Sequence, residues 1–121
     1  LAKKQNKKYI TLLGTGKAKR ELIFVDDVAD AVIHFMNKKT KENLINIGTG
    51  KDASIKEYAN FIINRLGLKL DIKFDKSYPD GTLRKVLDTS LAKKYGWAAK
   101  TDLKAGFDKT YEEFLKKKLY L

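Results

Sequence analysis

Short extended runs alternate with helix-like segments along this 121-residue chain. Residues 9–13 are β-branched and apolar and end at a Gly-Thr-Gly turn, which is typical of a strand. Residues 21–25 and 43–47 are interpreted as further strands, and residues 68–74 alternate apolar and polar side chains as a half-buried strand does. The alternation favours an α/β architecture. With so few strands, we expect a small mixed sheet or a piece of a larger one.

Three helices are predicted in the second half of the chain. The best supported follows Ser54, because Ser54 and Glu57 match a capping box and Gly67 suits the residue that closes a helix. A short helix is expected over residues 91–95, with a cap among residues 88–90. A last helix is expected from about Asp102 to Lys118.

One more helix is predicted near residue 26, with Asp26 or Asp27 as its cap. Its apolar residues keep the spacing of a single buried face, and His34 falls on the opposite, solvated side. The residues of that expected buried face are Val25, Val28, Ala29, Val32, Phe35 and Met36.

The composition bounds the class of protein. The length suits one domain over residues 1–121, and 43% hydrophobic residues indicate a folded chain. The absence of cysteine excludes disulfides and thiol chemistry and fits a cytoplasmic protein, while one histidine cannot make a zinc site. No apolar run approaches the roughly 20 residues that span a bilayer, so we expect no membrane partner. Residues 1–10 lack the apolar core of a secretory signal.

The net charge of +11 raises the possibility of a nucleic-acid partner. Residues 1–20 carry seven cations and no acid, so much of the excess is local. Single-strand binding also needs aromatic side chains among the cations, and only Tyr9 lies there. A nucleic-acid-binding module is therefore the less favoured alternative.

Two identical Gly-Thr-Gly-Lys turns, residues 14–17 and 48–51, are candidate phosphate loops. Glycines let backbone N–H groups approach an anion, and lysine adds charge. Neither turn extends to a complete nucleotide-binding motif. A plain turn remains as good an interpretation of the first, and a strand-to-helix connection is the preferred interpretation of the second.

The cations near the only proline form a second candidate site. Arg20 ends the first basic loop, and Arg84 and Lys85 follow the turn Pro79-Asp80-Gly81. Because arginine holds phosphate oxygens through a planar fork and lysine adds a point charge, two such loops that converge could bind a diphosphate. A solvated turn is the alternative. Asp80 could accept from a sugar hydroxyl or shape the turn.

No catalytic set is present. The chain has no cysteine nucleophile and no Tyr-x-x-x-Lys pair, so we expect no catalytic residue and no metal ligand in it.

Four segments in order resemble one protein family. GTGKAKRELIFVDDVADAV, NLINIGTGKDASIKEYANFI, SYPDGTLRKVLDTSLAKKYGW and TDLKAGFDKTYEEFL are similar to the C-terminal half of the GDP-L-fucose synthases. These are extended short-chain dehydrogenase/reductases of the NAD-dependent epimerase/dehydratase family. The first two segments are shared widely among nucleotide-sugar epimerases, and the PDGT-x-RK segment is more particular to the fucose synthase branch.

The resemblance implies a GDP-sugar-binding lobe that is inactive alone. A further N-terminal Rossmann half would bind NADP(H) and carry the catalytic residues that convert GDP-4-keto-6-deoxy-mannose to GDP-L-fucose, and the parent would be a homodimer. Residues 43–47 would form a strand of the nucleotide-binding sheet.

Site residues follow from the resemblance position by position. Arg20 matches a diphosphate contact, and Asp80 and Lys85 match two further substrate contacts. Leu13 stands where some members have a substrate-contacting tryptophan, while the role of Arg84 stays open. Two prolines of the family are replaced, by Ala18 and Leu83.

These departures keep sibling enzymes open, such as a reductase of a GDP-linked heptose. A non-binding fragment whose sheet edge pairs with a second copy is a further alternative.

Overall fold

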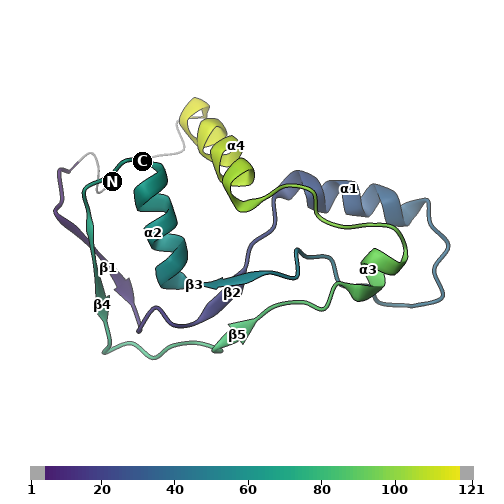
Figure 1. Cartoon of the computed structure of the whole chain (residues 1–121), viewed down its shortest axis with the longest axis horizontal. Helices are drawn as coiled ribbons and strands as arrows, with labels where there is room; N and C mark the ends of the chain where they lie inside the picture. Colours follow the sequence, from purple (N-terminus) through teal and green to yellow (C-terminus); the bar gives the residue numbers. More distant parts are fainter. Residues whose placement is uncertain (1–4, 118–121) are drawn as a thin grey trace. The chain divides into compact units, whose positions relative to one another are not determined.

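The computed structural model describes residues 5–117. The chain forms two compact units, which are described separately. Residues up to Arg20 together with Asp52–Lys85 form the sheet unit, and Glu21–Lys51 together with the residues from Val86 onward form the helical unit. Figure 1 shows the order of the elements. The small mixed α/β class is confirmed, and one domain over residues 1–121 stays a prediction.

Two short sheets occur in the sheet unit. β1 (Tyr9–Leu13) pairs in parallel with β4 (Asp71–Asp75), and Figure 1 shows the two strands side by side. β2 (Lys19–Glu21) lies between β3 (Asp52–Ser54) and β5 (Arg84–Lys85), and it pairs with β5 in parallel. The strand predicted over residues 68–74 corresponds to β4 and begins at Asp71, three residues later than the alternating pattern suggested.

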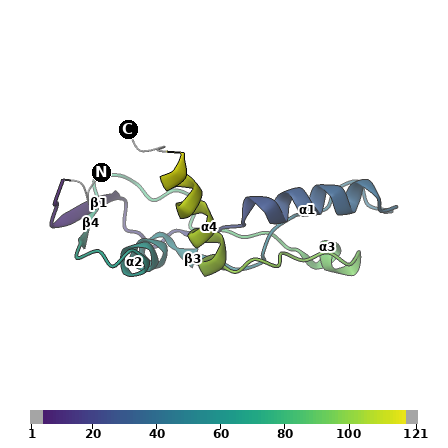
Figure 2. The ribbon, with the colours of Figure 1, turned by 90° about the horizontal axis from the view of Figure 1, so that it is seen from above.

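α2 (Ile55–Arg65) forms where local signals predict it, and Figure 2 shows it almost end-on. The Ser54 hydroxyl accepts from the Glu57 N–H at 3.1 Å, and the Glu57 carboxylate accepts from the Ser54 N–H at 2.7 Å. Gly67 adopts a φ of +59°, and the N–H groups of residues 67 and 68 donate back into the last turn. The capping box and the glycine terminus are both confirmed.

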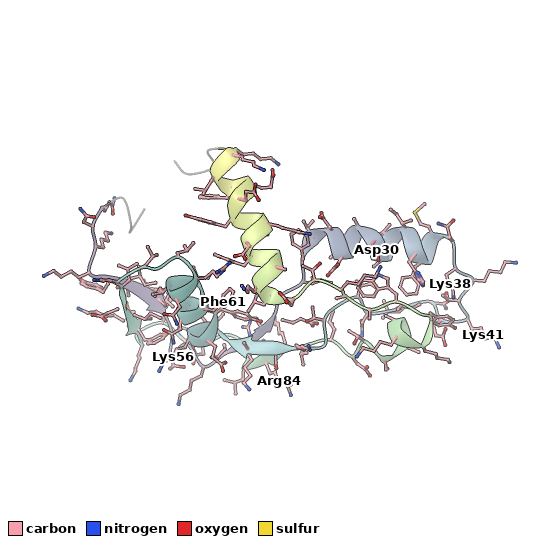
Figure 3. The ribbon with its side chains drawn as sticks, turned by 45° about the horizontal axis from the view of Figure 1, so that its top comes forward. Asp30, Lys38, Lys41, Lys56, Phe61 and Arg84 are labelled. Atoms are coloured by element: carbon pink, nitrogen blue, oxygen red, sulfur yellow. The ribbon has the colours of Figure 1, made fainter. Side chains whose placement is uncertain are left out.

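A small apolar core organises the helical unit. Trp97 is 3% exposed and packs with Ala31 of α1 (Val25–Met36) and Ala92 of α3 (Ser90–Lys94), both fully buried. The Trp97 indole N–H donates to the Asp30 carboxylate at 3.0 Å, and Asp30 is labelled on α1 in Figure 3. The core therefore joins helices that lie some sixty residues apart in the sequence.

The prediction for the buried face of α1 is wrong except at Phe35, which packs against the Trp97 core. Val25 is 68% exposed and Met36 is 79% exposed, and the core meets the helix at Ala31 and Phe35. The His34 ring, expected on the solvated side, is half-buried, and its Nε2 lies 2.9 Å from the Tyr95 carbonyl oxygen. The rest of the apolar stripe of α1 is thus open among the described residues, because the core meets the helix at one edge of that stripe, at Ala31 and Phe35.

Asp26 and Asp27 lie in the first turn of α1 rather than at its cap, which is Phe24 and has no side-chain cap bond. Their charge suits the positive end of the helix dipole. Asp27 is buried, and it accepts from the N–H and the hydroxyl of Thr101 at 2.9 and 3.0 Å. It joins the start of α1 to Thr101 instead of capping its own helix.

Two predicted strands do not form. The segment 21–25 contributes only Glu21 to a strand, and the helix begins at Val25. Residues 43–47 form no strand, since none of their backbone groups joins a ladder within residues 5–117. Strand propensity needs a neighbouring strand to pair with, and the described part of the chain supplies none here.

The last two helices match their predictions closely. α3 begins at Ser90, whose N–H donates to the Asp88 carboxylate. α4 (Leu103–Lys116) is capped by Asp102, whose carboxylate accepts from the Ala105 N–H at 2.7 Å. Its predicted end at Lys118 lies outside the described residues.

Candidate functional site

Strand register brings Arg20 and Lys85 together. They are register partners in the parallel pair β2–β5. Because side chains alternate across a strand and neighbouring strands lie about 4.8 Å apart, register partners project side by side from one face of a sheet. Lys85 is exposed, and its side chain makes no hydrogen bond or ion pair with any described residue. The two cations that the sequence placed on separate loops are therefore adjacent.

Arg20 is held at both its backbone and its side chain. Its Nη1 donates to the carbonyl oxygens of Thr82 and Lys19 at 2.7 and 2.6 Å, and its own carbonyl oxygen accepts from the Tyr58 hydroxyl at 2.9 Å. A Cβ at Gly81 would lie 3.3 Å from Nη2, so the loop passes close to the guanidinium. Bonds within the sheet unit therefore hold both the backbone and the guanidinium of Arg20 in place.

Arg84 projects from the other face of β5 and is engaged within the protein. Its Nε and Nη2 both donate to the Asp52 carboxylate, whose side chain is 8% exposed. The donated bond from Arg84 lowers the pKa of Asp52 against the opposing effect of burial, and the same contact raises the pKa of Arg84. Figure 3 labels Arg84. The role that the sequence left open is an ion pair across the three-stranded sheet.

Asp80 contacts the first Gly-Thr-Gly-Lys turn. Its carboxylate accepts from the Thr15 N–H at 2.8 Å and from the Thr15 hydroxyl. These two bonds lower the pKa of Asp80. A Cβ at Gly14, where φ is +80°, would lie 2.4 Å from the Asp80 Oδ1, so only glycine fits there. Whether Asp80 also accepts from a substrate hydroxyl stays a prediction.

Leu13 is the last residue of β1 and is 62% exposed. It projects from the same face as Tyr9, whose ring is covered by the Lys73 ammonium at 3.7 Å. The turn that receives Asp80 follows Leu13 directly. All four predicted site residues thus belong to the sheet unit, and the structure pairs Arg20 with Lys85 and joins Asp80 to the residues after Leu13.

Glu21 is a residue that the sequence interpretation missed. Its carboxylate accepts from the Gly50 N–H at 2.6 Å, the Thr49 hydroxyl at 3.1 Å and the Leu87 N–H at 2.9 Å. Burial raises its pKa, but these bonds together bring the pKa below its ordinary value. The repeated turn was the available signal, although its spacing does not reveal a carboxylate 28 positions away.

The two glycine turns do not fit the phosphates of a dinucleotide. In each turn the hydroxyl and an N–H that would approach a phosphate already donate to a carboxylate of the same chain. A second anion there would meet that negative charge. The described residues also contain no cluster of three metal-ligating side chains. No helix within residues 5–117 has the length and apolarity to cross a bilayer.

Comparison with known proteins places these features in a family. Residues 1–48 match the NAD dependent epimerase/dehydratase family. The chain is 39% identical to the GDP-L-colitose synthase of Yersinia pseudotuberculosis over 113 residues, which cover 93% of this chain and 37% of that protein. It is 38% identical to the probable GDP-L-fucose synthase 1 of Oryza sativa over 114 residues, covering 94% and 35%. This chain is homologous to the GDP-L-fucose synthases.

A solved structure agrees with this homology. The GDP-mannoheptose C4 reductase of Campylobacter jejuni, with NADP bound, superimposes with a TM-score of 0.77 at 38% identity. The match covers 89% of this chain and 35% of the reductase. The chain thus spans little more than a third of the length of these curated relatives.

Proposed function

We propose that this chain is the GDP-sugar-binding lobe of an NADP-dependent epimerase/reductase of the GDP-L-fucose synthase type. The observation that carries the proposal is the register of β2 and β5, which sets Arg20 beside Lys85. Relatives at 38–39% identity named for GDP-linked sugars support the substrate class.

The adjacent cations suit a nucleotide diphosphate. A guanidinium offers a planar fork to two phosphate oxygens, and an ammonium adds a compact charge beside it. The sheet unit as a whole carries fourteen cations and five acids in residues 1–20 and 52–85, so its field attracts anions. Leu13 and Asp80 would contact the rest of the substrate, Leu13 through apolar surface and Asp80 through a hydroxyl.

We assign the chemistry to a part of the protein other than this chain. The sequence contains no cysteine and no Tyr-x-x-x-Lys pair. NADP(H), when bound to the parent enzyme, would supply the hydride for reduction. The turns present here do not fit that cofactor, so the lobe binds and orients the GDP-sugar and is inactive alone. A homodimeric parent in the cytoplasm stays a prediction.

The helical unit offers a surface for the nucleotide-binding half. The apolar stripe of α1 includes Val32, 55% exposed, and Met36, and a groove of about 280 Å³ beside it is lined by Val32, Phe35, Ile45 and Ile47. The segment 43–47 also has an unpaired backbone among the described residues. Apolar surface and open strand edges both favour burial against another polypeptide. Since the relatives are nearly three times as long, we infer that their N-terminal part covers this face.

A reductase of a GDP-linked heptose is the second candidate. It shares the lobe and the diphosphate site, and the solved heptose reductase aligns over 89% of this chain. The two candidates differ only in the sugar.

Nuclear magnetic resonance titration with GDP tests the proposal on the full chain. We expect shifts at Arg20, Asp80 and Lys85, and no response to NADPH. Lys85→Met should weaken GDP binding by about tenfold, since a bond to a charged group contributes ~1.5–3 kcal/mol and tenfold corresponds to about 1.4 kcal/mol. Lys56→Met, an exposed lysine on α2 labelled in Figure 3, is the matched control and should bind as the wild type does. Absence of binding at millimolar GDP would contradict the proposal.

A further inference from the structure

The same four-residue turn occurs twice, once in each unit, and receives a carboxylate each time. In the sheet unit the N–H and hydroxyl of Thr15 donate to Asp80. In the helical unit the Thr49 hydroxyl and the Gly50 N–H donate to Glu21. Identical sequences in separate surroundings thus each bring a threonine hydroxyl and one backbone N–H to a carboxylate, although the N–H belongs to the threonine in the first turn and to the following glycine in the second.

The internal geometry of the turn explains these contacts. The N–H of Lys17 donates to the Thr15 hydroxyl oxygen at 3.3 Å, and the N–H of Lys51 donates to the Thr49 hydroxyl oxygen at 3.2 Å. Because each hydroxyl oxygen already accepts from within the turn, its proton is available to an acceptor, which is Asp80 for Thr15 and is Glu21 at 3.1 Å or the Lys51 carbonyl oxygen at 3.3 Å for Thr49. A carboxylate, which only accepts, fits that donor and the adjacent N–H.

The glycines complete the receptor. Gly16 and Gly50 have φ values of +74° and +70°, which residues with a side chain rarely adopt. At Gly14 an added Cβ would lie within 2.4 Å of the Asp80 carboxylate. The sequence Gly-Thr-Gly-Lys is therefore suited to closing around an acidic side chain of the same chain.

We propose that the turn at residues 14–17 is a carboxylate receptor that, by holding Asp80, keeps β5 paired with β2, and that Thr15 is thereby a positioning residue for Lys85. Its effect on ligand binding rests on the function proposed above. Its effect on strand pairing does not.

The brevity of β5 makes this anchor necessary. β5 has only two residues, and a ladder that short holds its register weakly. Two other hydrogen bonds join β2 to the loop at residues 76–83, which precedes β5. The Lys19 N–H donates to the Leu83 carbonyl oxygen at 2.7 Å, and the Arg20 guanidinium donates to the Thr82 carbonyl oxygen. Asp80 is the first anchor along this loop, five positions before Lys85. Its release lengthens the stretch of loop without an anchor that leads into β5.

The test compares Thr15→Val with Thr11→Val in the full chain. Both substitutions replace a hydroxyl by a methyl group, but Thr11 lies on the exposed face of β1 and no described residue bonds to its side chain. In Thr15→Val we expect the amide of Lys19 to exchange about tenfold faster and GDP to bind about tenfold more weakly, since a bond to a charged acceptor contributes ~1.5–3 kcal/mol and tenfold corresponds to about 1.4 kcal/mol. The carboxyl of Asp80 should also titrate at higher pH. Thr11→Val should match the wild type in all three measurements.

The outcomes separate the two proposals. Faster Lys19 exchange and a shifted Asp80 titration in Thr15→Val support the receptor. If the wild type does not bind GDP either, the GDP-sugar function is contradicted while the receptor still stands. Unchanged Lys19 exchange in Thr15→Val overturns the receptor, whatever GDP does. Thr15→Ser retains the hydroxyl, so its Lys19 exchange and its Asp80 titration should both match the wild type. If Thr15→Val does not fold, Asp80→Asn weakens the acceptor of the same two bonds, and Lys19 exchange alone is then compared: faster exchange supports the receptor, and unchanged exchange overturns it.

Discussion

Glu21→Gln is the most informative stability experiment, because one half-buried carboxylate accepts three hydrogen bonds. Oε1 accepts from Gly50 and Thr49, and Oε2 accepts from Leu87. Glutamine has nearly the same shape but only one oxygen. Its NH₂ group must face either the Gly50 N–H or the Leu87 N–H, and that backbone donor loses its acceptor.

The magnitude follows from this count. A hydrogen bond to a charged group contributes ~1.5–3 kcal/mol, and water around a half-buried side chain recovers part of one lost bond. We expect Glu21→Gln to lower the free energy of unfolding by about 2 kcal/mol at pH 7, measured by urea titration. Glu113→Gln on α4 is the matched control. Its partners Lys116 and Lys117 are exposed, so the change should stay within about 0.5 kcal/mol.

The pH dependence gives the decisive sign. The pKa of Glu21 is lowered in the folded protein from its ordinary value of 4.5. Its stabilisation is therefore complete above pH 4.5 and is lost as pH falls through the lowered pKa. The stability of the wild type should approach that of Glu21→Gln over this range. A difference that stays constant down to pH 2, or no difference at pH 7, would refute the reasoning.

Two further predictions concern other parts of the molecule. Ser54→Ala removes the acceptor of the Glu57 N–H and should cost about 1 kcal/mol in urea unfolding; equal stability would show that the capping box contributes nothing. Val32→Glu should abolish association with the separately produced NADP-binding half of a GDP-L-fucose synthase, measured by calorimetry, while Lys38→Glu beyond the end of α1 should not. Undiminished association of Val32→Glu would exclude the α1 stripe as the interface.

The local elements were predictable from the sequence because their stabilising contacts join residues three to five positions apart. The Ser54–Glu57 capping box and the Gly67 terminus are of this kind and formed as expected. Asp102, expected as the approximate start of the last helix, caps α4 through a bond of the same short range. The sequence also showed the charges of Arg20 and Lys85, but only the family resemblance led us to expect that the two residues act at one site. The register of β2 and β5 places them side by side.

The buried side of α1, the unpaired segment 43–47 and the acceptor role of Glu21 depended on tertiary structure. Trp97 packs against Ala31 of α1, some sixty positions away in the sequence. The apolar pattern of α1 instead predicted burial of the stripe that includes Val25 and Met36. Arg84 bonds to Asp52, which is 32 positions away in the sequence, and Asp80 bonds to Thr15, which is 65 positions away. Residue type and spacing determined which groups could donate, accept or cap. The tertiary structure alone decided which distant partner each group contacts. The energy of such a contact depends on where the two groups lie in space, and it produces no periodic pattern in the sequence.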